Sequence, residues 1–263
     1  MSNTIPDEQY NDHPGLSQSG AKILVSQSPA HFKAYLERDR SEQTAAQRLG
    51  TLIHLASLQP KVFDATIVVA PDCDKRTKEG KEIWAAFQSS LQPGQEAISQ
   101  KDGELVTAVS IAARAGLDKL MKDFDGVKME TEVPLVGRVN GIDIKGRLDA
   151  IITTKDGKKI VVDIKTTTDA SLNSFSRDCA NYMYFLQSAW YTTLAHADQF
   201  VFLAVEKDAP NAWACYTLDE ASHQKGLALM NSAIDLFRSC NTFKQFPGYP
   251  QEVQTMTLPK WVQ

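Results

Sequence analysis

The chain has 263 residues, of which 43% are hydrophobic and 23% charged, values typical of a globular protein that folds as one large domain. Its net charge of −4 excludes a uniformly basic surface, so any attraction to nucleic acid must come from a local patch. No apolar run approaches the roughly 20 residues of a membrane span, and the polar N-terminus has no signal core. We therefore expect a cytoplasmic protein with no membrane partner.

The first part of the chain has the pattern of helices. We expect a flexible arm over residues 1–15, after which Ser17 or Ser19 caps one helix and Ser28 a second. Apolar residues at helical spacing predict a helix over 44–59 that Pro60 ends. The elements expected next are a short strand over 65–71, an amphipathic helix within 73–91 and a long helix over 101–124.

The pattern changes to strands at residue 128. Alternating apolar residues predict strands over 128–138, 141–153 and 158–166, with tight turns at residues 140–141 and 155–157. The elements expected next are a helix over 172–197, strands over 199–207 and 211–218, a helix over 219–239 and an extended tail. This order predicts an α/β (α+β) fold, in which a mixed sheet is flanked by helices.

Two carboxylates lie in the most hydrophobic hairpin, "GRLDAIITTKDGKKIVVDIKTTT". If Gly157 takes the left-handed conformation in a three-residue loop, counting back from the turn puts Asp149 opposite Asp163. Two carboxylates about 5 Å apart repel each other unless a cation lies between them, and Mg²⁺ is a cation that prefers oxygen ligands. Lys165 can reach the same place. The alternative is an ordinary Asp–Lys ion pair on a strand, and a different loop register would separate the carboxylates.

Three residues on helices are further candidates. Gln187 and Tyr191 are four positions apart, so they share a helix face on which they could hold a DNA strand; Tyr191 could equally be a core residue. His54 lies in an apolar helix, four positions after Gly50, which leaves space beside the imidazole. A neutral histidine there could bind metal, or it could be a structural residue.

These residues together resemble a known family. Gly146-x-x-Asp149, then Asp163-x-Lys165, then Gln187-x-x-x-Tyr191 resemble the RecB-like branch of the PD-(D/E)xK nuclease superfamily. Several blocks look like its RecE, or exodeoxyribonuclease VIII, family in the same order: "LSQSGAKILVSQSPAHFKAYL", "RLGTLIHLASLQPKVFDATIVVAP", "DKRTKEGKE" and "TLPKW". Leu148 stands where the superfamily often has proline.

The resemblance implies a Mg²⁺-dependent exonuclease that degrades one strand of linear double-stranded DNA from its 5′ end. The 3′ single-stranded tail would serve a RecT-like annealing recombinase, in a phage or prophage setting. Two Mg²⁺ ions are expected during catalysis, with Mn²⁺ as a substitute, and a ring-shaped tetramer, or alternatively a trimer. A closed ring would explain how an acidic protein stays on DNA.

The resemblance also implies a role for each site residue. The metal ligands would be His54, Asp149, Asp163 and the Ile164 carbonyl, and the catalytic residues Asp149, Asp163, Lys165, Gln187 and Tyr191. The DNA contacts would be Ser17 or Ser19, Lys75, Arg76, Lys78 and Arg147. Residues 1–263 would form one nuclease domain, with a restriction-endonuclease-like αβββαββ core over 101–240, a helical N-terminal elaboration over 1–100 that contributes His54, and an extended tail over 241–263. The alternatives are a structure-specific endonuclease and a non-catalytic recombination scaffold.

Overall fold

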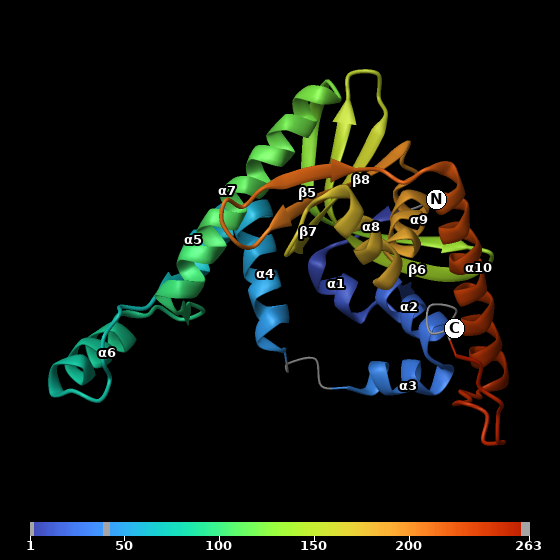
Figure 1. The fold of residues 1–263 in the computed structure, drawn as a ribbon, viewed down its shortest axis with the longest axis horizontal. Helices are drawn as coiled ribbons and strands as arrows, with labels where there is room; N and C mark the ends of the chain where they lie inside the picture. Colours follow the sequence, from blue (N-terminus) through green and yellow to red (C-terminus); the bar gives the residue numbers. More distant parts are fainter. Residues whose placement is uncertain (1–2, 39–42, 259–263) are drawn as a thin grey trace.

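A mixed β-sheet forms the centre of the computed structural model, which describes residues 3–38 and 43–258 (Figure 1). In this described part the main sheet has seven strands in the order β1-β5-β6-β7-β8-β9, with β2 paired to β6. Strands β5 to β7 form an antiparallel meander, β8 lies parallel to β7, and β9 is antiparallel to β8. The longer strands are β5 (Gly126–Val139), β6 (Ile142–Thr154), β7 (Lys159–Thr167), β8 (Gln199–Glu206) and β9 (Trp213–Tyr216).

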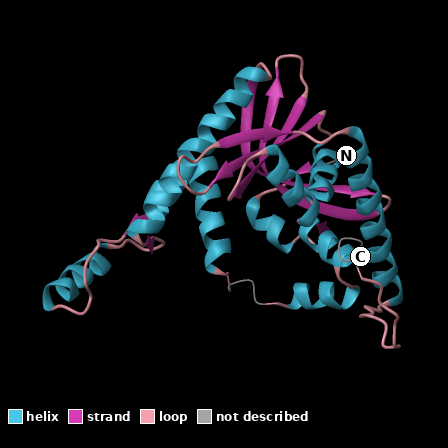
Figure 2. Ribbon diagram, viewed as in Figure 1, coloured by secondary structure: helices cyan, strands magenta, loops and turns pink. Residues whose placement is uncertain are grey.

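Helices cover both faces of this sheet, as Figure 2 shows. Along β7, Val162 packs into a core with α4 (Ala45–Leu58) and α7 (Gln100–Asp123). Val161 packs into a second core on the opposite face. The helices of that face are α2 (Gln18–Ser26), α3 (Pro29–Glu37), α8 (Leu172–Asn181), α9 (Tyr184–Ala195) and α10 (Glu220–Phe243). The predicted mixed sheet with flanking helices is therefore confirmed, and β7 is buried on both sides.

The N-terminal segment differs from the flexible arm expected for residues 1–15. Two short strands, β1 (Asn3–Thr4) and β2 (Leu16–Ser17), join the main sheet, and α1 (Asp7–Asp12) lies between them. The Lys145 ammonium on β6 donates to the backbone carbonyl of Tyr10 at 2.9 Å. These backbone contacts cannot be seen in the sequence of a polar segment. The prediction of a flexible arm is wrong for the described residues; residues 1–2 lie outside them.

A projecting arm carries the next elements (Figure 1). Helix α5 (Pro60–Thr66) leads to β3 (Ile67–Val69), which pairs in parallel with β4 (Glu96–Ile98) in a separate two-stranded sheet. Helix α6 (Lys78–Ser90) lies between these strands in sequence and at the tip of the arm in space. Strand β3 confirms the short strand predicted over 65–71, whereas β4 was not predicted, so the N-terminal 100 residues are not helical throughout.

The single helix expected over residues 172–197 is two helices, α8 and α9. The break falls at Met183, whose φ of 56° lies in the left-handed region. No glycine or proline occurs there, so the sequence gives no signal for the break.

The C-terminal part also differs from expectation, because α10 runs on to Phe243. Residues 244–258 have no regular structure, as expected for a tail, and the last part of the predicted tail, 259–263, lies outside the described residues. Within the described chain, no helix combines the length and apolar character of a membrane span.

Candidate active site

The hairpin of β6 and β7 has the predicted register. Ala150 pairs with Val162 and Thr153 with Lys159. The turn places Gly157 at φ +82°, and its N–H donates to the Thr154 carbonyl at 3.0 Å. Continuing this register puts Asp149 opposite Asp163, and the backbone N–H of Ile164 donates to Asp149 Oδ2 at 2.8 Å. Rigid strands thus hold both carboxylates.

The sheet changes the orientation of its side chains at this point. On β6, Leu148 packs into one core and Ala150 into the core on the opposite face, although both positions are even. On β5 the change falls at Glu132, which has a φ of 51° and lies opposite Asp149 in the continued register. A left-handed residue within a strand is uncommon and marks a functional or strained position. The change of face brings the Glu132 carboxylate to the site.

Three side chains form a group that could hold a metal ion. One ligand atom from each of His54, Glu132 and Asp149 lies within 4.8 Å of the other two. His54 Nδ1 is 3.4 Å from Asp149 Oδ2. The three residues line an open cavity of about 460 Å³ together with Gly50, Thr51, Leu55, Gln59 and Arg147. Gly50 has open space above it, as the sequence argument for His54 required.

Asp163 on β7 interacts electrostatically with Asp149 and His54, although it is not one of the three residues whose ligand atoms lie within 4.8 Å of one another; the four residues together are called the carboxylate cluster. The Asp163 side chain is 2% exposed, forms an ion pair with the ammonium of Lys165, and accepts a hydrogen bond from Gln187 Nε2 at 2.7 Å. The two partners come from a strand and from α9, so they fix the carboxylate from two directions. Asp163, Lys165 and Gln187 therefore lie together, as the strand spacing predicted for Lys165 and the family resemblance implied for Gln187.

The pKa shifts in the group are those of buried carboxylates that lie close to one another. Burial and the neighbouring Asp149 raise the pKa of Asp163 to about 6, although Lys165 opposes the rise. Burial disfavours the charged form of His54, but Asp149 outweighs burial and raises the imidazole pKa to about 9. Burial and Asp149 also raise the pKa of Glu132. A divalent cation would relieve the repulsion behind these changes.

Tyr191 packs behind the hairpin and contacts Gln187. Burial raises the pKa of the Tyr191 hydroxyl well above its usual range, and Gln187 hydrogen bonds with it. The ring passes close to Gly146, where an added Cβ would lie 2.8 Å from Tyr191 Cε1. Glycine at the start of the G-x-x-D segment therefore makes room for the tyrosine four positions after Gln187.

The donor set fits a hard divalent cation. His54, Glu132, Asp149 and Asp163 offer one imidazole nitrogen and several carboxylate oxygens, a mixture that suits Mg²⁺ or Mn²⁺ better than a softer ion. The N–H of Ile164 donates a hydrogen bond to Asp149. The Ile164 carbonyl remains a predicted metal ligand. Glu132 was not predicted, because strict alternation of Met129, Thr131 and Val133 assigns it to the solvent face.

The predicted DNA-contacting residues lie in two regions. Arg147 lines the cavity of His54 and Asp149, where it forms an ion pair with Asp7 at 3.0 Å. Ser17 caps α2, accepting from the Gly20 N–H at 3.2 Å, and Ser19 is exposed on the first turn of the same helix.

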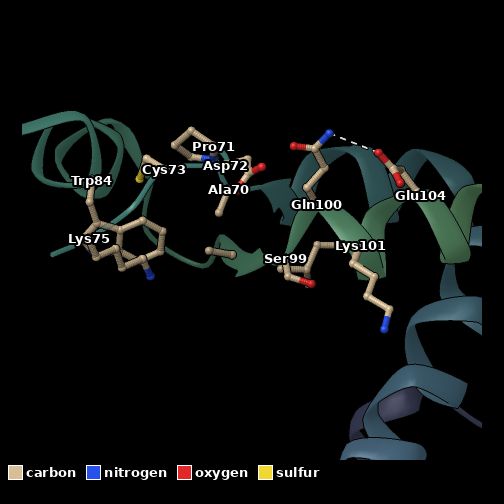
Figure 3. A pocket seen from close by; sticks show the side chains of 12 residues that line it. Ala70, Pro71, Asp72, Cys73, Lys75, Trp84, Ser99, Gln100, Lys101 and Glu104 are labelled. Carbon is tan, nitrogen blue, oxygen red and sulfur yellow. Dashed lines mark hydrogen bonds between the residues drawn. The ribbon is translucent and has the colours of Figure 1, made fainter. Parts of the chain in front are cut away.

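The basic residues of the other region lie on the projecting arm. Lys75 Nζ is 3.1 Å from the centroid of the Trp84 ring beside a cavity of about 600 Å³ (Figure 3). Arg76 pairs with Asp74 at 3.0 Å, and Lys78 begins α6. These three residues lie in and just before α6, away from the elements that carry the carboxylate cluster, and their contact with DNA remains a prediction.

Comparison with known proteins gives a family and a fold. A solved structure of a putative exonuclease from Eubacterium rectale is 12% identical, with a TM-score of 0.62 over 98% of this chain and 97% of that one. A phage-related exonuclease from Haemophilus somnus is 14% identical, with a TM-score of 0.38 over 90% of this chain and 100% of that one. No curated protein matches the sequence. The model of the family described as "PDDEXK-like domain of unknown function (DUF3799)" matches residues 17–259. The chain therefore belongs to this PDDEXK-like family.

Proposed function

We propose that the protein is a Mg²⁺-dependent exonuclease that degrades one strand of linear double-stranded DNA in the 5′-to-3′ direction. One observation carries the proposal: the PDDEXK-like fold brings His54, Glu132 and Asp149 within 4.8 Å of one another, next to the paired Asp163 and Lys165. Proteins of this kind are generally divalent-metal nucleases, and the solved structure of similar fold carries the name "putative exonuclease".

Each residue has a distinct task in phosphodiester hydrolysis. His54, Glu132, Asp149 and Asp163 would hold Mg²⁺, with two ions engaged during catalysis and Mn²⁺ able to replace them. When bound, the metal supplies Lewis-acid chemistry: it neutralises phosphate charge and acidifies water. The Lys165 ammonium lies against Asp163, where it can orient the attacking water and stabilise charge on the phosphate.

The remaining site residues position these groups. Gln187 holds Asp163 through its 2.7 Å hydrogen bond and connects it to Tyr191. Arg147 reaches the same cavity and would bind a phosphate of the DNA once Asp7 releases it. The terminal 5′ phosphate would meet Ser17 or Ser19 at the start of α2.

The wider biological role follows from the resemblance to the RecE family. We infer that the 3′ single-stranded product is passed to a RecT-like annealing recombinase for homologous recombination. A ring-shaped homotetramer, or a trimer, would enclose the duplex, with Lys75, Arg76 and Lys78 facing it. The basic side chains would then concentrate in one channel of a chain whose net charge is −4.

The test is digestion of a linear duplex that carries a label at either the 5′ or the 3′ end. We expect early release of the 5′ label as nucleotide, a 3′ single-stranded product, and no reaction in EDTA. Covalently closed circular duplex should stay intact. Cutting of the circle would favour the alternative of a structure-specific endonuclease. Absence of metal-dependent digestion of any DNA would leave the alternative of a non-catalytic recombination scaffold.

A further inference from the structure

We propose that Tyr182 and Lys22 form a subsite for the strand being cut, in which the tyrosine ring stacks on a base and the ammonium binds the neighbouring phosphate. The subsite would hold the nucleotide next to the scissile phosphate. This inference rests on the proposed nuclease function and adds to it the residues that hold an unpaired nucleotide beside the metal.

Two neighbouring aromatic rings with a cation at each end form a row that leads from the carboxylate cluster to the surface. Lys165, paired with Asp163, has its Nζ 4.8 Å from the centroid of the Tyr184 ring. The Tyr184 and Tyr182 ring centroids are 5.6 Å apart, and Lys22 Nζ lies 5.8 Å from the Tyr182 centroid. The row therefore begins at the site of chemistry and ends at a residue of α2.

The break between α8 and α9 creates this arrangement. Tyr182 and Tyr184 flank Met183, whose left-handed backbone ends one helix and starts the next. Tyr184 packs inward near Phe175 and Phe202, with centroids 6.0 Å and 5.9 Å away. Tyr182 remains 51% exposed. In a continuous helix, these two residues would point in directions about 200° apart, so the break is what allows the two rings to lie side by side.

The two ammonium groups of this row, those of Lys22 and Lys165, suit the binding of an anion. Burial lowers the pKa of Lys22, and the nearby Lys165 ammonium lowers it further. No carboxylate in the described part of the chain forms an ion pair with Lys22. Two neighbouring ammonium groups repel each other, and a phosphate between them would relieve the repulsion.

An unpaired DNA strand has the chemistry that fits. Proteins that bind single strands combine aromatic rings, on which bases stack, with cations that bind the phosphates. Stacking tolerates any base, as degradation of DNA of any sequence requires. Duplex DNA hides its base faces, so a stacking residue here would act on a nucleotide already separated from its complement.

The experiment compares the wild type with Tyr182→Ala and Lys22→Gln on a linear duplex in Mg²⁺. We expect KM for DNA to rise about tenfold in each variant, with kcat changed little and with Tyr182→Phe restoring the wild-type value. Lys225→Gln is the matched control, since Lys225, on α10, also places its Nζ near an aromatic ring, 5.7 Å from the centroid of Phe185 on α9. It should behave as the wild type.

Two further substrates separate stacking from general damage. An abasic position at the nucleotide nearest the cut should raise the wild-type KM, and Tyr182→Ala should add no further effect. Bis(p-nitrophenyl) phosphate has no base, so both variants should hydrolyse it at the wild-type rate. The subsite would be overturned if Tyr182→Ala had the wild-type KM for DNA. It would also be overturned if the variants lost activity equally on DNA and on bis(p-nitrophenyl) phosphate. A wild type that cuts no DNA would instead refute the proposed function.

Discussion

In the absence of metal, the ionised carboxylate of Asp163 should lower the free energy of unfolding. Replacing Asp163 by asparagine tests this directly. The pKa of Asp163 rises from its usual 3.8 to about 6 because the side chain is buried beside Asp149. The folded state then binds this proton more tightly than the unfolded state does. The resulting stabilisation is complete below pH 3.8 and is lost as the pH rises through about 6.

At pH 8 the ionised carboxylate therefore has a free-energy cost. The rise in the pKa of Asp163 from 3.8 to about 6 corresponds to a cost of about 3 kcal/mol as an upper bound. Asparagine removes this cost and still accepts the hydrogen bond from Gln187, but it leaves the ammonium of Lys165, whose side chain is 16% exposed, without its carboxylate. We expect a net stabilisation of about 1 kcal/mol, or a rise in Tm of about 3 °C for a chain of this length.

The assay is thermal unfolding of metal-free Asp163→Asn at pH 8 and at pH 5, beside digestion of linear duplex. The gain in Tm should shrink at pH 5, where the wild-type carboxyl is largely protonated. Nuclease activity should be lost, because the carboxylate holds the metal. Adding Mg²⁺ should raise Tm in the wild type alone. A variant several degrees less stable than the wild type at pH 8, or one that still digests DNA, would refute this reasoning.

Three other changes test the neighbouring residues. His54→Ala should weaken Mg²⁺ binding about tenfold or more with little loss of unfolding free energy; unchanged Mg²⁺ dependence of the rate would exclude His54. Glu132→Gln should also reduce metal affinity, by about 10- to 100-fold in a calorimetric titration, and an unaltered affinity would exclude it as a ligand. Gly146→Ala should lower the free energy of unfolding by about 1–3 kcal/mol, because its Cβ would meet Tyr191 at 2.8 Å. An unchanged free energy in urea unfolding would show that the site tolerates the methyl group. Because the pKa of His54 is about 9, metal binding at pH 7.5 should release about one proton, seen as a calorimetric enthalpy that depends on the buffer.

The sequence was sufficient to predict the β6–β7 hairpin because the pattern that determines its faces and register is local. Alternation identified the two buried faces of β7, and the turn at Gly157 fixed the register that brings Asp149 to Asp163. Helical spacing likewise placed Gln187 and Tyr191 on one face, and the structure has Gln187 contacting both Asp163 and Tyr191.

The sequence was insufficient where the backbone departs from regular geometry. Glu132 and Met183 take positive φ without being glycine, and each departure brings a side chain to a place that periodicity does not predict. The N-terminal strands form through backbone pairing with β5 and β6, which distant parts of the chain supply. Such effects depend on tertiary contacts, and local propensity does not encode them.

The central claim is that His54, Glu132, Asp149 and Asp163 hold the metal ion that makes the protein a nuclease. Diffraction from crystals grown with Mn²⁺ tests it most directly, because the anomalous signal locates the ion without reference to activity. We predict a peak within bonding distance of Asp149 and Asp163, at about 2.0–2.3 Å from their carboxylate oxygens, and its absence in Asp163→Asn. Full Mn²⁺-dependent digestion with no peak at these residues, or a peak bound elsewhere, would contradict the account.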